Sequence, residues 1–213
     1  MVTISEYIES HTALPDSVLD GIERWAHLHT AQPQMICGPA EGQLLTLLCR
    51  SVASRCAVEV GAFVGYSTVC IARGLAEGGT LHTFEVNEEY ADIIRHHLSL
   101  AGVAQRVNVR IGDAKKLIPN VFEAEEPAVD FAFIDADKRH TKEYYDILVP
   151  RMRRGGLLLV DNVLWGGKVL DTDTHRDADT LCINQFNNYV QQDSRVANTM
   201  LAIRDGLLIC RVL

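Results

Sequence analysis

From Cys56 onward, short apolar runs alternate with longer segments that carry apolar residues at helical spacing. The short runs predict strands at 57–60, 80–86, 107–111, 129–134 and 157–160. The longer segments predict helices at about 67–76, 88–101 and 142–152. Strands that alternate with helices indicate crossover connections and a mostly parallel sheet, so the fold class is α/β.

After Asp161 this alternation stops. A polar stretch at 171–179 leads to a predicted helix near 181–191. Two further apolar runs, 195–203 and 207–212, flank Asp205-Gly206, a dipeptide that favours tight turns. The pattern therefore predicts a C-terminal antiparallel hairpin.

The first fifty or so residues predict helices rather than strands. We expect a short helix capped by Thr3 or Ser5, a second from Pro15 to about His29, and a third from Glu41 to Ala53. Two prolines and a glycine mark 32–39 as a loop. We therefore expect residues 1–54 to form a helical cap beside a core of residues 55–213.

Length and composition limit the possibilities further. A chain of 213 residues suits one α/β domain, and 47% hydrophobic with 23% charged residues is typical of a soluble globular protein. The formal charge of -8 disfavours a nucleic-acid partner, because affinity for phosphate backbones comes largely from lysine and arginine.

The cysteines and the N-terminus indicate where the protein works. Six cysteines are scattered without a CxxC pair, which suits a reducing cytoplasm, and Cys70 and Cys210 are expected as buried core thiols. No export signal or membrane-spanning run is visible, so no membrane partner is expected. The histidines have no ligand spacing and are expected on the surface.

Charged side chains gather where two predicted strands end. Asp135 follows the 129–134 strand, and Asp161 and Asn162 follow the 157–160 strand. Open α/β sheets bind ligands at this edge, and hard oxygen ligands suit Mg²⁺, Mn²⁺ or Ca²⁺. Aspartates in such positions also cap helices or face solvent, and that alternative stays open.

Lys138 lies three residues after Asp135, close enough to share one cavity. A partly desolvated lysine beside a cation is a candidate general base near neutral pH. The alternative is an ordinary surface lysine.

A glycine turn, Gly61 to Gly65, joins the 57–60 strand to the next helix and resembles a nucleotide site in outline. Its Gly-x-x-x-Gly spacing differs from that of dinucleotide binders. Glu85 ends the following strand, where an acidic residue can bind both ribose hydroxyls. Glu59 lies between two valines in a core strand and needs a partner there. Two simpler interpretations remain. The glycines form only a turn, and Glu85 is a solvated charge at the end of its strand.

Five motifs together resemble the cation-dependent O-methyltransferases, the family of caffeoyl-CoA and catechol O-methyltransferases. They are VEVGAFVGYS, FEVNEEY, GDA, FIDADK and VDNVLWGG, and the resemblance covers about Met35 to the C-terminus. It implies a Rossmann-like methyltransferase fold with a seven-stranded sheet that ends in an antiparallel hairpin. It also implies a homodimer.

The resemblance assigns roles to individual residues. It implies Asp135, Asp161 and Asn162 as metal ligands and Lys138 as the candidate base. Around S-adenosylmethionine it places the Cys37 backbone, Glu59, Gly61, Phe63, Ser67, Glu85, Ala114 and Asp137. The implied reaction is methyl transfer to a hydroxyl of a catechol-like small molecule, with Mg²⁺, Mn²⁺ or Ca²⁺ holding the vicinal hydroxyls.

The chain departs from the plant caffeoyl-CoA enzymes near its acceptor side. Those enzymes carry an asparagine after the tryptophan of the DNTLWNG motif, where this chain has Gly166 after Trp165. The N-terminal region shows no match to their acyl-CoA-binding part, so a smaller catechol-like acceptor is expected. Trp165 is a candidate wall of that pocket or a packing residue.

Two other functions remain open. One is a methyltransferase that acts on RNA or another polar metabolite, which the acidic balance disfavours. The other is a non-catalytic protein that binds cofactor or partners on a methyltransferase scaffold. Loss of a metal ligand or of Lys138 would favour the latter, and all four residues are present.

Overall fold

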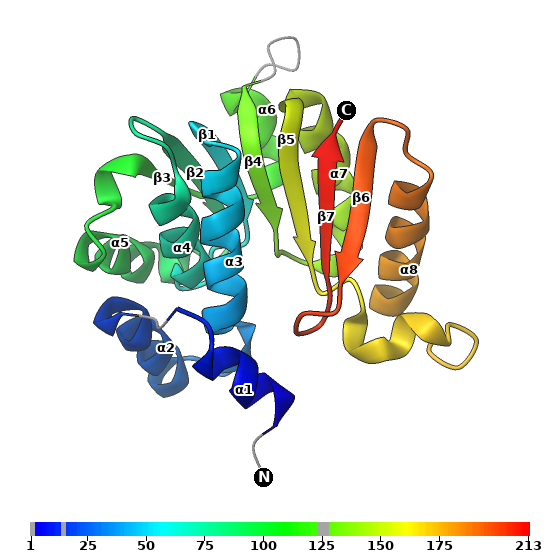
Figure 1. Cartoon of the computed structure of the whole chain (residues 1–213), viewed down its shortest axis with the longest axis horizontal. Helices are drawn as coiled ribbons and strands as arrows, with labels where there is room; N and C mark the ends of the chain where they lie inside the picture. Colours follow the sequence, from blue (N-terminus) through cyan, green and yellow to red (C-terminus); the bar gives the residue numbers. More distant parts are fainter. Residues whose placement is uncertain (1–2, 14–15, 123–127) are drawn as a thin grey trace.

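The computed structural model describes residues 3–13, 16–122 and 128–213. One seven-stranded sheet runs through it in the order β3-β2-β1-β4-β5-β7-β6 (Figure 1). The strands are β1 (Cys56–Val60), β2 (Thr80–Glu85), β3 (Val107–Ile111), β4 (Val129–Ile134), β5 (Met152–Asp161), β6 (Val196–Leu201) and β7 (Leu207–Val212). Only β7 runs against its neighbours, so the expected mostly parallel sheet with a C-terminal antiparallel hairpin is confirmed.

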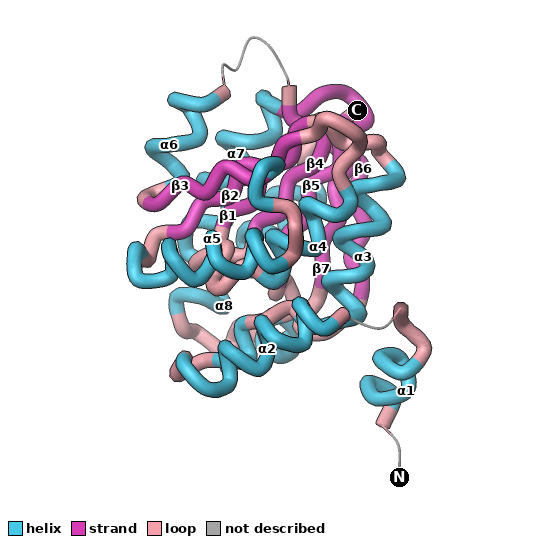
Figure 2. The backbone as a smooth tube through the Cα atoms, turned by 90° about the vertical axis from the view of Figure 1, so that its left-hand side faces the viewer, coloured by secondary structure: helices cyan, strands magenta, loops and turns pink. Residues whose placement is uncertain are grey.

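Helices lie on both faces of the sheet (Figure 2). The α-helices are α1 (Ile4–Ser10), α2 (Ser17–His29), α3 (Gly38–Ser51), α4 (Tyr66–Gly74), α5 (Ala91–Leu100), α6 (Ala114–Val121), α7 (Thr141–Leu148) and α8 (Ala178–Gln191). Short 3₁₀ segments are η1 (Pro33–Met35), η2 (Glu88–Tyr90), η3 (Ala104–Arg106), η4 (Lys138–His140), η5 (Val149–Arg151) and η6 (Trp165–Leu170).

Alternation along the strands divides the core into two layers. On β4, Phe131 and Phe133 pack with helices α2 to α5, whereas Ala132 and Ile134 pack with α6, α7 and α8. All four side chains are at most 1% exposed. A strand buried on both faces needs apolar residues throughout, which explains the continuous apolar run in the sequence.

The N-terminal helices begin where the sequence supplies capping groups. Thr3 caps α1 and forms a capping box with Glu6, which settles the choice between Thr3 and Ser5. Asp16 caps α2 by accepting hydrogen bonds from two backbone amides of the first turn. The predicted start at Pro15 lies outside the described residues. Helix α3 begins at Gly38, three residues before the expected Glu41.

The structure corrects three other expectations. Helix α6 was not predicted, because it is only eight residues long and contains Pro119, a residue that disfavours helix interiors. Strand β5 begins at Met152, where the sequence pattern predicted helix. His97 is 3% exposed and hydrogen-bonds through Nδ1 to the Val64 carbonyl, so the expectation of surface histidines is wrong there.

The buried thiols and the hairpin turn are confirmed. All six cysteines are free thiols, and Cys70 and Cys210 are buried. Within the described ranges, no helix is long and apolar enough to cross a membrane. Gly206 turns the β6–β7 hairpin with a φ of 90°, next to Asp205 as expected.

Candidate functional site

The site residues meet where strand order reverses. Strand β1 pairs with β2 on one side and β4 on the other, and the chain order changes direction between β1 and β4. Val60 is in register with Ile134, and Ile134 with Val160. The next residue on each strand is therefore Gly61, Asp135 or Asp161, and these three lie side by side at the carboxyl edge. Ligands of open α/β sheets bind outside this edge.

Gly61 allows two chain segments to approach closely. Its φ is +96°, and a Cβ at this position would lie 2.1 Å from the Asp135 carbonyl oxygen. The amide of Asp135 donates to the Val60 carbonyl over 2.9 Å, which fixes β4 against β1 at this point. A larger residue at position 61 would push the Asp135 backbone away from the edge.

Asp135 and Lys138 form an ion pair at this edge. Lys138 Nζ donates to Asp135 Oδ1 over 3.0 Å, and the two side chains are 12% and 21% exposed. Lys138 reaches Asp135 because η4 begins at Lys138, after a short connection from the end of β4, and turns the chain back. A largely buried amine thus lies beside the proposed ligand carboxylate.

Asp161 is the most buried member of the predicted metal-binding set, with 4% of its surface exposed. Burial raises the pKa of its carboxyl, and the negative charge of Asp135 raises it further. Its Oδ1 accepts the amide of Asn162 over 2.7 Å. Asn162 has a φ of 61°, a left-handed conformation that asparagine tolerates better than most residues.

These residues fit a hard divalent cation. Two carboxylates and one amide are oxygen donors, and the repulsion between Asp135 and Asp161 is a cost that a bound cation would relieve. Across the part of the chain that the structure describes, no three side chains of His, Cys, Asp or Glu are grouped to hold a metal. The predicted metal-binding set has two acidic residues, Asp135 and Asp161, and one amide, Asn162, so it does not meet this description.

Glu59 has the partners that its burial requires. Its carboxylate accepts hydrogen bonds of 2.6 Å from the hydroxyls of Ser67, Thr68 and Thr83. Burial raises the pKa of Glu59 to about 7, although these hydrogen bonds oppose the rise. Ser67 and Glu59 are thus brought together beneath the glycine turn.

Glu85 is bound to the glycine turn through the backbone. Its Oε2 accepts the Phe63 amide and its Oε1 the Asn87 amide, each over 2.8 Å. The Phe63 ring meets Tyr90 edge to face, with 5.1 Å between centroids. Each Glu85 oxygen keeps one further lone pair, so the carboxylate can still accept a hydrogen bond from a ligand hydroxyl.

The other predicted cofactor residues lie on segments that follow β3 and β4 or begin α3. Ala114 is buried at the start of α6, directly after the end of β3. Cys37 is 4% exposed at the start of α3. Asp137 is exposed and accepts hydrogen bonds from His140 and from the Tyr144 hydroxyl. Partial burial raises the pKa of Asp137, but these hydrogen bonds outweigh it, and the net shift is downward.

The loop after Asn162 carries the residues that the sequence analysis assigned to the acceptor pocket. Gly166 and Gly167 have φ values of 61° and 79°, and a Cβ at either would meet no atom within 4 Å. The Gly166 amide donates to Asp205 Oδ1 over 2.5 Å, which ties this loop to the β6–β7 turn. Trp165 is half-buried, and its Nε1 has no hydrogen-bond partner among the described residues.

Sequence reasoning missed Glu41 and Arg204. Glu41 is fully buried in the first turn of α3, and Arg204 Nε in the β6–β7 turn lies 3.6 Å from Glu41 Oε2. The spacing of Glu41 to the buried Leu45 and Cys49 places it on the core face of the helix. That pattern of a charged residue on an apolar helix face was the available signal.

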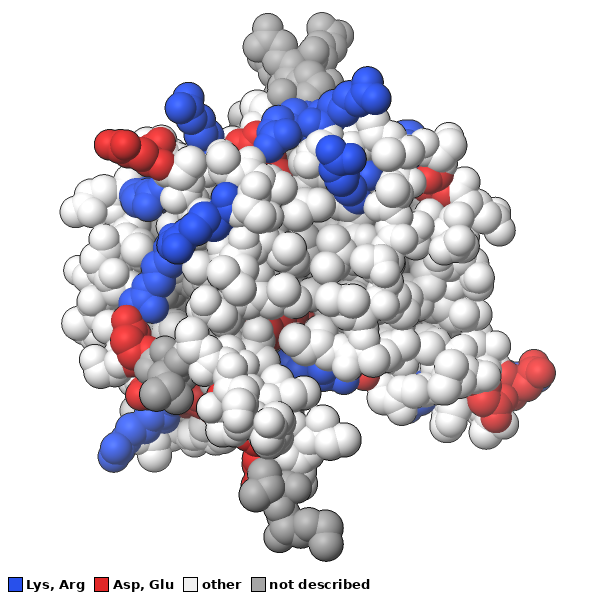
Figure 3. All heavy atoms as spheres, viewed as in Figure 1, with Lys and Arg blue, Asp and Glu red and all other residues white. Residues whose placement is uncertain are grey.

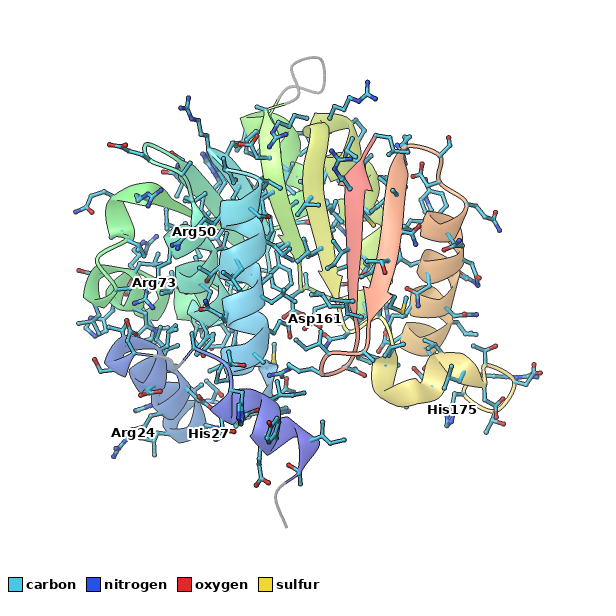
Figure 4. All side chains as sticks on the ribbon, viewed as in Figure 1. Arg24, His27, Arg50, Arg73, Asp161 and His175 are labelled. Atoms are coloured by element: carbon cyan, nitrogen blue, oxygen red, sulfur yellow. The ribbon has the colours of Figure 1, made fainter. Side chains whose placement is uncertain are left out.

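Figure 4 shows Asp161 at the lower edge of the sheet, between the first turn of α3 and the β6–β7 turn. In the space-filling view, acidic atoms lie in a recess at the lower middle of this face, beside basic atoms (Figure 3). Two other hollows lie elsewhere. One of about 440 Å³ includes Arg95 and Val107, and one of about 240 Å³ includes Thr46 and Arg73. Neither contains the predicted residues, so charge and register rather than hollow size locate the site.

Known proteins are similar to this chain over most of its length. A family model described as O-methyltransferase matches residues 9–213. Tricin synthase 2 from Oryza sativa subsp. japonica is 36% identical over 185 residues, which cover 81% of this chain but 62% of that protein. The chain thus spans less than two thirds of that relative's length.

Two further relatives cover nearly all of this chain. A probable caffeoyl-CoA O-methyltransferase from Arabidopsis thaliana is 31% identical over 200 residues, 91% of this chain and 86% of that protein. The crystal structure of the O-methyltransferase from Bacillus cereus in complex with SAH matches with a TM-score of 0.89 and 32% identity, over 99% of this chain and 97% of that chain. These matches confirm the Rossmann-like methyltransferase fold and show that the chain belongs to the O-methyltransferase family that includes the caffeoyl-CoA O-methyltransferases.

Proposed function

We propose that this protein transfers a methyl group from S-adenosylmethionine to one hydroxyl of a catechol-like small molecule, with a divalent cation at Asp135, Asp161 and Asn162. The observation that carries the proposal is the register of β4 and β5, which brings two carboxyls together at a buried edge. Membership of the O-methyltransferase family supports the reaction type. The SAH found in the Bacillus cereus relative supports the methyl donor.

The chain's own residues divide the binding work. Asp135 and Asp161 would supply carboxylate oxygens and Asn162 its amide oxygen to Mg²⁺, Mn²⁺ or Ca²⁺. When bound, the cation supplies Lewis-acid stabilisation of a phenolate and a common anchor for two vicinal oxygens. Glu85, with its free lone pairs, is the proposed acceptor for the ribose hydroxyls, on the other side of the glycine turn.

Lys138 is the proposed general base. Its Nζ already lies at the edge of the site, 3.0 Å from Asp135 Oδ1, and is largely shielded from solvent. The unprotonated amine would take the proton of the reacting hydroxyl. The oxygen would then attack the methyl carbon as the S–CH₃ bond breaks, and S-adenosylhomocysteine would leave. Proximity and alignment do most of this work, so no covalent intermediate with the protein is required.

Two assays test the proposal. The purified protein is incubated with S-adenosylmethionine, Mg²⁺ and a panel of catechols, and mass spectrometry detects the gain of one methyl group. The same reaction is then repeated in excess EDTA. Methylation that EDTA abolishes and Mg²⁺ restores is the expected result, whereas full activity in chelator would contradict the cation's role.

The assays also separate the alternatives. Methylation of RNA with no reaction on catechols would favour the RNA methyltransferase. Cofactor binding without methylation of any acceptor would favour a non-catalytic scaffold. A cytoplasmic location stays a prediction, as does the division into a cap and a core within one domain.

We also propose a homodimer. Large apolar side chains are exposed on α1 and α3, namely Ile4 at 81%, Tyr7 at 59% and Leu47 at 52%. Apolar surface at neighbouring helices is typical of interfaces between chains. Light scattering coupled to size exclusion measures the mass directly, and a mass of one chain at micromolar concentration would exclude the dimer.

A further inference from the structure

Glu41 is a buried carboxyl whose role the predicted site does not explain. None of its surface is exposed, and neither carboxyl oxygen has a hydrogen-bond partner among the residues that the structure describes. A buried polar group without a partner is costly, and a buried carboxylate more so. Such a residue on the core side of a helix needs a compensating ligand or function.

Arg204 compensates Glu41 only in part. Arg204 Nε lies 3.6 Å from Glu41 Oε2, close enough for an ion pair but too far for a hydrogen bond. The same guanidinium donates to the Gln34 carbonyl over 3.2 Å, and its other terminal nitrogen lies against Gly38. Arg204 is therefore held by the loop before α3 and neutralises Glu41 without occupying its oxygens.

Glu41 lies on the aspartate side of the site, because Asp161 lies between the first turn of α3, which holds Glu41, and the β6–β7 turn, which holds Arg204 (Figure 4). After burial, the charges that raise its pKa most are those of Asp161 and then Asp135, while Arg204 and Lys138 oppose them. Three carboxyls thus face two basic side chains in one region. Acidic side chains outnumber basic ones here, which favours additional positive charge or strong hydrogen-bond donors.

Glu41 could act on the proposed cation either as a direct ligand or through water. Within the described residues, Glu41 does not form a three-acid metal-binding group with Asp135 and Asp161. We therefore place Glu41 outside the ligand set of this ion. Divalent cations such as Mg²⁺ keep several water molecules, and the polarised hydrogens of such waters bind well to nearby carboxylates.

We propose that Glu41 is a positioning residue of the cation site, which accepts hydrogen bonds from water held by the cation at Asp135, Asp161 and Asn162. Arg204 holds the Glu41 carboxylate in place from the β6–β7 turn. The inference rests on the cation of the proposed function, but it concerns a residue outside the ligand set. It explains why a carboxyl without internal hydrogen bonds is kept at this point of α3.

Binding of Mn²⁺ tests this proposal without any methyl transfer. Electron paramagnetic resonance measures free Mn²⁺ in titrations of the wild type, Glu41→Gln, Glu41→Asp and Glu77→Gln, with no acceptor or cofactor present. Glu77 is an exposed glutamate in the turn after α4 and serves as the matched control for the loss of one charge. Calorimetry then measures S-adenosylmethionine binding by each variant.

We expect Glu41→Gln to weaken Mn²⁺ binding by about 10-fold or more, the effect typical of a group that holds a metal's ligands in place. Glu41→Asp should recover part of the affinity, because it keeps the carboxyl group on a shorter chain. Glu77→Gln should behave as the wild type, and binding of S-adenosylmethionine should be unchanged in all four proteins. If Glu41→Gln does not fold, the comparison of Glu41→Asp with Glu77→Gln decides alone.

Three results would overturn the inference. Mn²⁺ affinity of the Glu41 variants equal to that of Glu77→Gln would remove Glu41 from the cation site. Weaker cofactor binding with unchanged Mn²⁺ affinity would instead assign Glu41 to the cofactor's ammonium group. No Mn²⁺ binding by the wild type would overturn both the inference and the proposed cation. Mn²⁺ binding that depends on Glu41, without methylation of catechols, would leave the inference standing and refute only the proposed reaction.

Discussion

Lys138 Nζ lies 3.0 Å from Asp135 Oδ1, and both side chains are mostly shielded from solvent. Asp135 therefore has an amine on one side and, across the strand register, the carboxyl of Asp161 on the other. In the proposed reaction Asp135 ligates a cation, so it no longer needs the lysine as its counter-charge. The Lys138 amine is then available to the acceptor hydroxyl.

Replacement of Lys138 by alanine should slow methyl transfer by about 10² to 10⁴-fold, the range typical of a lost general base. Cofactor binding should be unchanged, because the lysine contacts Asp135 and not the glycine turn. Single-turnover assays and calorimetry measure the two quantities separately. Lys142→Ala is the matched control, since Lys142 pairs with Asp146 on the exposed side of α7. Equal rates for both variants would exclude Lys138 as the base.

The buried carboxyls should make the cation-free protein less stable as pH rises. Burial raises the pKa values of Asp161 and Glu41 and brings that of Glu59 to about 7. The folded state then holds protons that the unfolded state releases above about pH 4, so this contribution to stability is full at lower pH and is lost as pH rises through the raised pKa values. Thermal unfolding in EDTA between pH 5 and 8, compared with Asp161→Asn, isolates the effect of Asp161.

Added Mg²⁺ should reverse that trend in the wild type. A ligand at 100 times its dissociation constant stabilises the folded state by about 2.7 kcal/mol, and the gain should grow with pH as the carboxyls lose their protons. Asp161→Asn should show no gain. If the melting temperature of the wild type does not change when Mg²⁺ is added at pH 8, the result would argue against a cation at this edge.

Gly61→Ala should damage both the fold and the cation site. Its Cβ would lie 2.1 Å from the Asp135 carbonyl oxygen, and its φ of +96° is unfavourable for alanine, so we expect a loss of about 3 kcal/mol or more in unfolding free energy. Gly21→Ala is the control, because nothing lies within 4 Å of that position in helix α2. It should gain about 0.5–1 kcal/mol. Denaturant titration measures both, and similar stabilities would contradict the close approach.

The order of apolar runs was enough to predict the strands and the hairpin, because β4 and β5 are buried on both faces and Gly206 marks the turn. It was not enough for helix α6, where Pro119 weakens the helical signal and packing against α7 supplies the missing stability. The carboxylate edge followed from strand ends alone. The place of Glu41 at this site could not be predicted in the same way. Its partners lie in segments distant in the chain, and only the folded structure brings Arg204 close to it.

Gly166→Asn should change the choice of acceptor without disturbing the rest of the site. Asparagine tolerates the left-handed conformation that Gly166 adopts with a φ of 61°, and a Cβ there would meet no atom within 4 Å. The variant should therefore fold with a stability within about 0.5 kcal/mol of the wild type, as expected for a surface substitution. The new amide would project from the loop beside Trp165, where the plant enzymes of this family carry asparagine. We expect kcat/KM for larger catechol esters to rise relative to free catechol, while cofactor and Mn²⁺ affinities stay the same. Gly167→Asn, one residue further along the same open loop, is the control, and an equal change of preference in both variants would show that the effect is not specific to position 166.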